Sequence, residues 1–226
     1  DPELEERVGG ALDPAGIDDP VAPAVEPLER LLALAEIARG EGETASEALR
    51  MAADLARTLD ALLVEEIAPA RLAEAAAEAP DLAGHWQLSL DRLRAILKTW
   101  PERLAELGKL DPAERRNLLL RRLAKRWRSD PPPGFTVAAG ITTAAPAVAA
   151  LLKTVAFMPE GTLVLPGLAL TPSVPDEEWD SLGPDAKGKA EETHPQYHLK
   201  LLLDRLGIAR EEVRLWPRVG RAGSGR

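Results

Sequence analysis

The stretch Pro131–Leu168 constrains the fold of this chain more than any other. It carries two short runs rich in β-branched and apolar residues, FTVAA from Phe135 and GTLVL from Gly161. A helix-length apolar segment, from about Pro146 to Phe157, separates them. That order and spacing are typical of a βαβ unit, whose strands are parallel and joined by a right-handed crossover. We therefore expect both runs to lie in a buried sheet, with the helical remainder of the chain built onto it.

The region before this stretch has the pattern of consecutive amphipathic helices. Thr44 and Glu47 form a capping box, in which each side chain bonds a backbone N–H that lacks a partner in the first turn. Asp111 and Pro112 supply an N-cap and a first helical residue for a further helix, which we expect to end near Arg128. The predicted fold class is therefore α/β and predominantly helical.

Shifts in composition divide the chain into four parts. Residues 1–26 are rich in Pro, Gly and acidic residues and are interpreted as a linker. A helical subdomain follows over 27–110, and a helix with the βαβ unit over 111–171. Residues 172–226 contain an acidic loop, an amphipathic helix that begins at a Pro and ends at a Gly, and a C-terminal linker. Because the sequence opens without Met, we expect it to be a piece of a longer protein.

Composition excludes several classes of protein. No apolar run approaches the length needed to span a membrane, so no membrane partner is expected. The absence of Cys rules out disulfides, thiolate metal sites and cysteine nucleophiles in these residues. A chain without Cys and without a secretory signal is expected to be cytoplasmic. The net charge of −9 argues against a protein that coats nucleic acid over its whole surface.

The charge is unevenly distributed, and one predicted helix is strongly basic. Residues 1–80 hold 19 acids against 6 bases, whereas residues 112–130 hold 7 bases against 2 acids. At 100° per residue, one side of this helix carries the apolar residues Leu119, Leu120, Leu123, Ala124 and Trp127, and Leu118 interrupts the opposite side. The other side carries Arg115, Arg121, Arg122, Lys125, Arg126 and Arg128. Two hypotheses stay open: a solvated face whose charges pair with the acidic helices, or a face that contacts nucleic-acid phosphates.

The catalytic motifs in the sequence are defective, and we expect no catalytic or metal-binding residue. The segment 183–190 resembles a phosphate-binding loop, but it ends in Ala190 where a Mg²⁺-binding hydroxyl is required, and no strand precedes it. A nuclease-like pattern over 175–187 lies in a Pro-rich acidic loop without strand character. His194 and His198 are four residues apart, but helix capping and surface exposure explain them better than a metal. A small hydrolase is therefore the weakest hypothesis.

Four motifs in series resemble the AddB family, the double-strand break repair subunits of AddAB helicase–nucleases, in its alphaproteobacterial form. They are LDPAERRN from Leu110, the strand end AAG at 138–140, VLPGL from Val164 and HPQYHLKLLLDRLG from His194. The resemblance covers roughly residues 23–217. It implies a fragment of the family's N-terminal, helicase-like region. The helical block resembles the 1B insertion of superfamily 1 helicases, and the Pro131–Leu168 stretch resembles the sheet of their 1A motor domain.

The resemblance also implies that this motor sheet is inactivated. In active helicases of the superfamily the corresponding strand ends in Asp-Glu, which holds Mg²⁺ and positions the attacking water. Here the strand leads into Gly140, Ile141, Thr142 and Thr143, without a carboxylate. The family's iron–sulfur cluster and its nuclease with Mg²⁺ belong to the far C-terminal part of the parent chain, so no cofactor is expected in this fragment.

The function implied by the resemblance is that of a non-catalytic part of a complex for recombinational repair. It would act as a scaffold and DNA contact during end processing of double-strand breaks, with an AddA-type partner subunit supplying the ATP-driven motor. The alternative is a helical protein–protein interaction or regulatory module without DNA binding. In that case the acidic N-terminal half would dock a basic partner.

Overall fold

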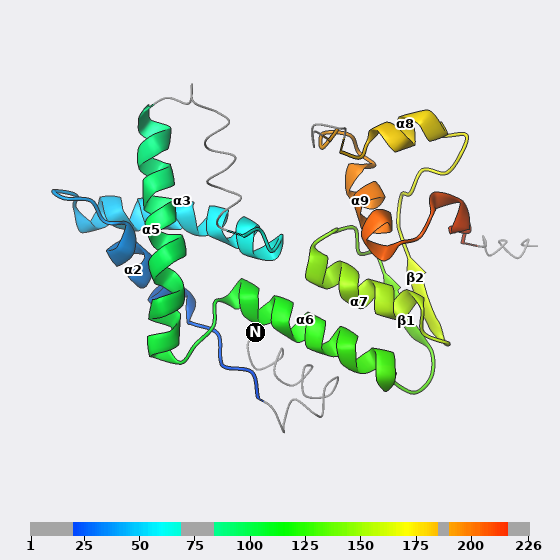
Figure 1. Cartoon of the computed structure of the whole chain (residues 1–226), viewed down its shortest axis with the longest axis horizontal. Coiled ribbons are helices and arrows are strands. Elements are labelled where there is room, and N and C mark those ends of the chain that lie inside the picture. The colour runs from blue at the N-terminus through cyan, green and yellow to red at the C-terminus, as the bar shows by residue number, and fades with distance from the viewer. Residues whose placement is uncertain (1–19, 69–83, 185–189, 217–226) are drawn as a thin grey trace, which may run out of the picture. The chain divides into compact units, whose positions relative to one another are not determined.

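The structure, a computed structural model, describes residues 20–68, 84–184 and 190–216, and only the backbone of residues 84–88. This part of the chain is predominantly helical and contains a two-stranded parallel sheet (Figure 1). The predicted α/β, predominantly helical class is therefore confirmed. No helix within these residues is long and apolar enough to cross a membrane.

The chain forms two compact units, the first ending at Leu123 and the second beginning at Ala124. The division falls inside helix α6 (Pro112–Ser129), whereas composition placed a boundary between residues 110 and 111. The difference has a physical reason. The first turns of α6 bond to other helices of the first unit, while Ala124 accepts a hydrogen bond from Thr154 in the second unit.

Three helices build the core of the first unit: α2 (Pro27–Ala38), α3 (Ala45–Val64) and α5 (Gly84–Leu107). Their apolar residues recur at helical spacing and bury Leu34, Leu59 and Ile96 almost completely. The capping box at the start of α3 is confirmed. Thr44 N donates to Glu47 Oε2 at 2.9 Å, and Glu47 N donates to Thr44 Oγ1 at 3.3 Å.

Helix α5 continues through Pro101, although a proline after residues at helical spacing usually marks the end of a helix. Proline in a helix interior removes one backbone hydrogen bond. Trp100 and Leu104, on either side of this position, are 2% and 4% exposed in the core. Burial of these two side chains offsets the lost bond, and the helix ends only at Gly108, which adopts the left-handed conformation with φ +63°.

The last residues of the predicted N-terminal linker belong to the first unit. Val25 N donates to Leu110 O and Leu110 N donates to Pro23 O, both at 2.9 Å. Val25 itself is 1% exposed and lies in the core. Residues 20–26 thus run as an extended segment beside the start of α6, and the rest of the predicted linker lies outside the described residues.

A buried carboxylate fixes the beginning of α6. Asp111 is fully buried, and its Oδ1 accepts a hydrogen bond from Ala113 N at 3.0 Å, which confirms the predicted N-cap. Its Oδ2 accepts from Arg30 Nε at 2.8 Å and from Trp100 Nε1 at 3.0 Å. Arg30 also bonds Asp60 at 2.7 Å. The network therefore links α2, α3, α5 and α6.

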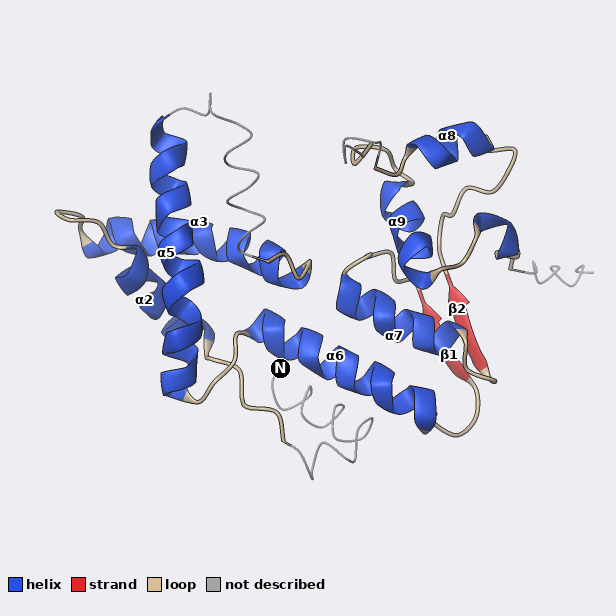
Figure 2. Ribbon diagram, in the orientation of Figure 1, coloured by secondary structure: helices blue, strands red, loops and turns tan. Residues whose placement is uncertain are grey.

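The second unit contains the predicted βαβ unit (Figure 2). Strands β1 (Thr136–Ala139) and β2 (Gly161–Val164) pair in parallel, with Thr136 opposite Gly161, and α7 (Pro146–Ala156) connects them. Helix α9 (Tyr197–Leu206) packs with α7 around a core that includes Leu152, Leu202 and Leu206. Two short elements complete the unit, α8 (Asp176–Ser181) and the 3₁₀ helix η2 (Arg210–Glu212).

The expectation of a buried sheet is wrong for one face of β1, whereas all four residues of β2 are half-buried. Ala138 packs against the core of the unit, whereas Val137 is 45% exposed and Phe135, just before β1, is 70% exposed. Successive strand residues point to opposite faces. The second face therefore stays open to solvent, because no described element of this unit covers these side chains.

Candidate nucleic-acid interface

The segment after β1 turns the chain toward α7 and carries no acid. Gly140 N continues the ladder by donating to Val164 O at 3.1 Å, and its φ of +77° starts the turn. Ile141 packs against the core, Thr142 is exposed, and Thr143 Oγ1 accepts a hydrogen bond from Ala145 N at 3.3 Å. These residues shape a strand-to-helix connection, and none can act as a carboxylate ligand or base.

The loop after β2 is held by a neutral side chain that the sequence analysis did not single out. Gln196 Nε2 donates to Gly167 O at 3.0 Å, and Gln196 Oε1 accepts from Ala169 N at 2.9 Å. The only sequence signal for this role is the position of Gln196 in the HPQ motif, directly before α9. The Gln196 amide thus satisfies two backbone groups of the loop in place of another backbone segment. Because the side chain is neutral, it adds no charge near the ends of the strands.

The defective motifs are only partly visible, since residues 185–189 lie outside the described residues. The acid of the nuclease-like pattern, Asp176, forms an ion pair with the buried Arg210. His194 Nδ1 accepts a hydrogen bond from Gln196 N at 3.1 Å, and its Nε2 lies 3.4 Å from Glu178. Within the described ranges no three His, Asp or Glu side chains are grouped to hold a metal ion.

Helix α6 buries only part of the stripe that its sequence predicts, since Ala124 is buried as expected and Leu119 is not. Asn117 and Ala124 are 6% and 1% exposed, whereas Leu118 and Leu119 are 38% and 37% exposed. Leu119 was predicted to lie on the buried side. The shift has a clear cause: Asn117 Nδ2 donates to Leu63 O at the C-terminal end of α3, at 2.8 Å, and this bond draws Asn117 inward.

Arg121 has a carboxylate partner in the first unit. Its Nε donates to Glu66 Oε1 at 2.8 Å and its Nη2 to Glu66 Oε2, a bidentate pair that raises the pKa of the guanidinium. Glu66 adopts a left-handed conformation with φ 54° just after the end of α3. The paired carboxylate thus sits where a phosphate could also be held by the same fork of N–H groups.

The other predicted cations differ in how far they are engaged. Arg115 Nε donates to Ala22 O at 3.1 Å, Arg128 Nε to Ala124 O at 3.2 Å, and Arg126 lies 3.6 Å from Asp130. Arg122 is half-buried. Lys125 is exposed and has no hydrogen-bond or ion-pair partner among the residues described. The hypothesis of internal pairing therefore accounts for part of this set and not for Lys125.

Arg116 is the cation on α6 that the sequence analysis missed. It is exposed and has no partner within the described ranges. On an ideal helical projection it falls beside Leu123 and Trp127, so it was not grouped with the basic residues on the other side of the helix. Because the buried stripe follows Asn117 and Ala124 instead, Arg116 reaches solvent. It points to the side of α6 opposite Lys125, since nine residues at 100° each separate the two side chains by 180°. We call Arg121, Arg122, Lys125, Arg126 and Arg128 the basic face of α6.

Comparisons with known proteins give no match: no family model, no curated protein and no solved structure matches this chain. The basis for a function is therefore the basic face of α6, the strand ends without carboxylates, and the motifs of the sequence.

Proposed function

We propose that this chain is a non-catalytic, helicase-like part of a DNA end-processing helicase–nuclease, in which it is a scaffold and contacts the DNA backbone through α6. One observation carries the proposal. Helix α6, of 18 residues, has seven basic residues and the single acid Glu114, in a chain whose net charge is −9. Such a concentration of cations on one helix is the electrostatic signature of phosphate contact.

The contacts expected of this helix are with phosphates rather than with bases. Lys125 is exposed without a described partner, and Arg128 is exposed on the same side of α6, so both can neutralise phosphates and release counterions from the nucleic acid. Arg121 presents a planar fork that is already occupied by the Glu66 carboxylate, and a phosphate could take its place. Contacts of this kind position a strand without reading its sequence.

The scaffold role is supported by the way α6 is fixed to the first unit. Asp111 holds its first turn through bonds to Arg30 and Trp100, and Asn117 ties its middle to the end of α3. A helix held at two places loses little conformational entropy when it binds, because its backbone is already ordered. The basic face is thus preorganised for a strand that lies along it.

The helicase-like part of the proposal rests on the βαβ unit and on the segment after its first strand. We propose that β1, α7 and β2 are a remnant of a 1A-like motor sheet and that the helical block is its 1B-like insertion. No carboxylate stands between Gly140 and Thr143, where a motor would hold Mg²⁺. In this proposal ATP hydrolysis is the task of an AddA-type partner subunit, and this chain supplies shape and DNA contact.

The direct test is binding of fluorescein-labelled single-stranded DNA, measured by anisotropy at low ionic strength. We expect the double variant Lys125→Glu/Arg128→Glu to bind at least about tenfold more weakly, since each phosphate contact is worth roughly 1 kcal/mol at low salt. The control is Arg94→Glu/Arg103→Glu, which makes the same change in charge at two exposed positions of α5. Equal loss in both double variants would show that only net charge matters and would contradict the role of α6.

A specific observation also favours the second candidate, a protein-interaction module without DNA binding. Arg115, Arg121, Arg126 and Arg128 each have a partner within the chain, as a solvated structural helix would. If the wild-type chain binds no DNA at low salt, this second function replaces the first.

A further inference from the structure

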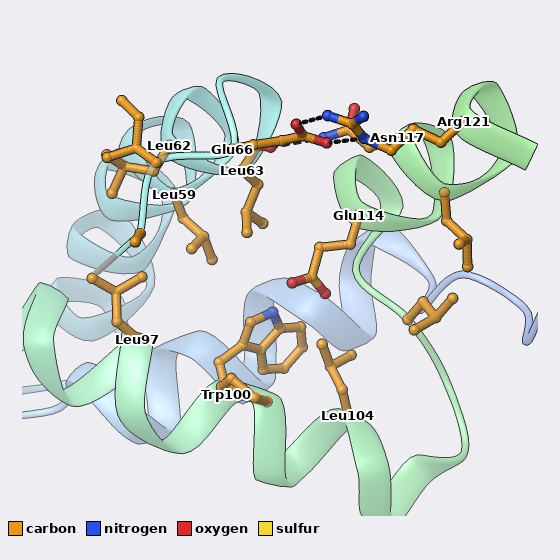
Figure 3. A pocket seen from close by; sticks show the side chains of 15 residues that line it. Leu59, Leu62, Leu63, Glu66, Leu97, Trp100, Leu104, Glu114, Asn117 and Arg121 are labelled. Atoms are coloured by element: carbon orange, nitrogen blue, oxygen red, sulfur yellow. Dashed lines mark hydrogen bonds and ion pairs between the residues drawn. The ribbon is translucent and has the colours of Figure 1, made fainter. Parts of the chain in front are cut away.

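The first unit contains an apolar cavity of about 650 Å³ that the proposed function does not use. Its walls are apolar side chains from the end of α3 and from α5, among them Leu59, Leu62, Leu63, Leu97, Trp100 and Leu104. Glu114, Asn117 and Arg121 of α6 complete the lining (Figure 3). A volume of this size is within the range of cavities that hold small organic ligands.

Two acceptors in the lining of this cavity, on Glu114 and Asn117, have no donor among the described residues. The Glu114 side chain points toward Trp100 in Figure 3 and accepts no hydrogen bond from any described residue. Asn117 uses its Nδ2 on Leu63 O, and its Oδ1 is buried without a hydrogen-bond partner in the described structure. A buried acceptor left unpaired costs about 1–3 kcal/mol.

The one cationic side chain in the lining is already engaged. Arg121 holds Glu66 through two hydrogen bonds at the rim, so it does not neutralise Glu114. Glu114 is exposed to solvent, so it lies where a ligand can reach it from outside. Desolvation of its carboxylate and the neighbouring Asp111 raise the pKa of Glu114, so its surroundings disfavour the bare negative charge. The cavity thus combines apolar walls, one unneutralised carboxylate and one unpaired amide oxygen.

We propose that this cavity binds a small organic cation, a primary ammonium or guanidinium group on an apolar body, with Glu114 as the counter-ion. The apolar body fills the space between α3 and α5, and the cation supplies the N–H donors that Glu114 lacks, because the donors of the lining are bonded elsewhere. Because Asn117 Oδ1 is closed to solvent, it is reached only if the amide turns, so Glu114 is the primary contact. The cavity shares Arg121 with the basic face of α6, but its proposed counter-ion, Glu114, takes no part in the proposed DNA contact.

Three probes with one apolar body and different charge test the proposal: 4-phenylbutylamine, 4-phenyl-1-butanol and 4-phenylbutyrate. Affinities are measured by calorimetry at pH 7, and the site is located by the amide shifts of Leu63, Glu114 and Asn117 in the full chain. We expect the amine to bind about fivefold more tightly than the alcohol, as a partly desolvated ion pair of roughly 1 kcal/mol would give. The carboxylate should bind weakest.

The variant Glu114→Gln keeps the shape of the side chain and removes its charge. We expect it to bind amine and alcohol with equal affinity, while Glu102→Gln, at an exposed position of α5 outside the cavity, keeps the fivefold preference. The proposal is overturned if none of the probes binds, if the shifted amides lie away from the cavity, or if the amine preference persists in Glu114→Gln. The ranking of the three probes by the wild-type chain tests the proposal even if a variant fails to fold.

Discussion

The indole N–H of Trp100 donates to the carboxylate of Asp111 at 3.0 Å, and the two side chains are 2% and 0% exposed. This bond joins α5, through its residue next to Pro101, to the first turn of α6. Arg30 of α2 completes the pair from a third helix. The position of the basic helix in the first unit therefore depends on one buried ion pair and its neighbours.

Replacing Asp111 by Ala should strongly destabilise the first unit. The change leaves Arg30 without one of its two carboxylates and removes the N-cap of α6, and breaking a buried ion pair costs about 3–5 kcal/mol. Urea unfolding followed by tryptophan fluorescence measures the loss. Asp54→Ala, which breaks an exposed pair with Arg57, should cost less than about 1 kcal/mol. A loss below that value for Asp111→Ala would show that the network does not hold α6.

Arg210 is a buried charged residue that holds together the second unit, as Asp111 does in the first. We expect Arg210→Lys to lower the free energy of unfolding by about 2 kcal/mol. The guanidinium is 3% exposed, bonds Val174 O at 2.9 Å and Thr171 Oγ1 at 3.0 Å, and lies 4.7 Å from the Trp179 ring centre. Lysine keeps the charge but loses the planar fork and the stacking. Thermal unfolding compares this variant with Glu211→Gln, a neighbouring exposed position where little change is expected. Equal melting temperatures would contradict the anchoring role.

The raised pKa of Glu114 makes a prediction about pH and stability. A carboxyl whose pKa is higher in the folded chain than its usual 4.5 binds protons more readily when folded, so ionisation lowers stability as pH rises through that range. Glu114→Gln should therefore be slightly more stable than wild type at pH 7, with the difference vanishing below the usual pKa. Urea midpoints at both pH values measure this. A stabilisation that persists at the lower pH would assign the effect to packing rather than to charge.

Glu66 and a phosphate compete for the same guanidinium, so Glu66→Gln should increase the affinity for single-stranded DNA. An exposed pair is worth about 0.5 kcal/mol, which corresponds to roughly a twofold gain. Glu43→Gln breaks the Arg92–Glu43 pair away from α6 and removes the same charge. If both variants gain equally, the effect comes from net charge alone and Arg121 takes no part in binding.

Structural features that depend only on residues close together in the sequence were predictable from it. The capping box at Thr44 and Glu47, the N-cap Asp111 and the order strand–helix–strand all depend on local backbone geometry, and all are present. The C-terminal end of α9 at Gly207 was also predictable, because glycine readily adopts the left-handed conformation that ends a helix, here with φ +70°. Its start at Tyr197 is two residues later than Pro195, because Gln196 is held by the loop after β2.

Features that depend on distant residues were not predictable. Nothing near Asp111 in the sequence indicates its bond to Arg30, 81 residues away. The inward turn of Asn117 depends on Leu63 O, 54 residues away. That bond decides which side of α6 is buried, and so it exposes Leu119 and Arg116 against the helical projection. The open face at Val137 has the same origin, since local pattern cannot show which elements cover a strand.

The dependence of DNA affinity on salt tests the central claim most directly. For single strands, log Kobs falls with log salt with a slope of about −0.7 for each phosphate neutralised. If the basic face of α6 holds the strand, the slope should be steeper than about −2, and Lys125→Glu/Arg128→Glu should make it shallower by about one or more. A binding constant that does not change with salt, or a slope that the double variant leaves unchanged, would contradict DNA contact through α6.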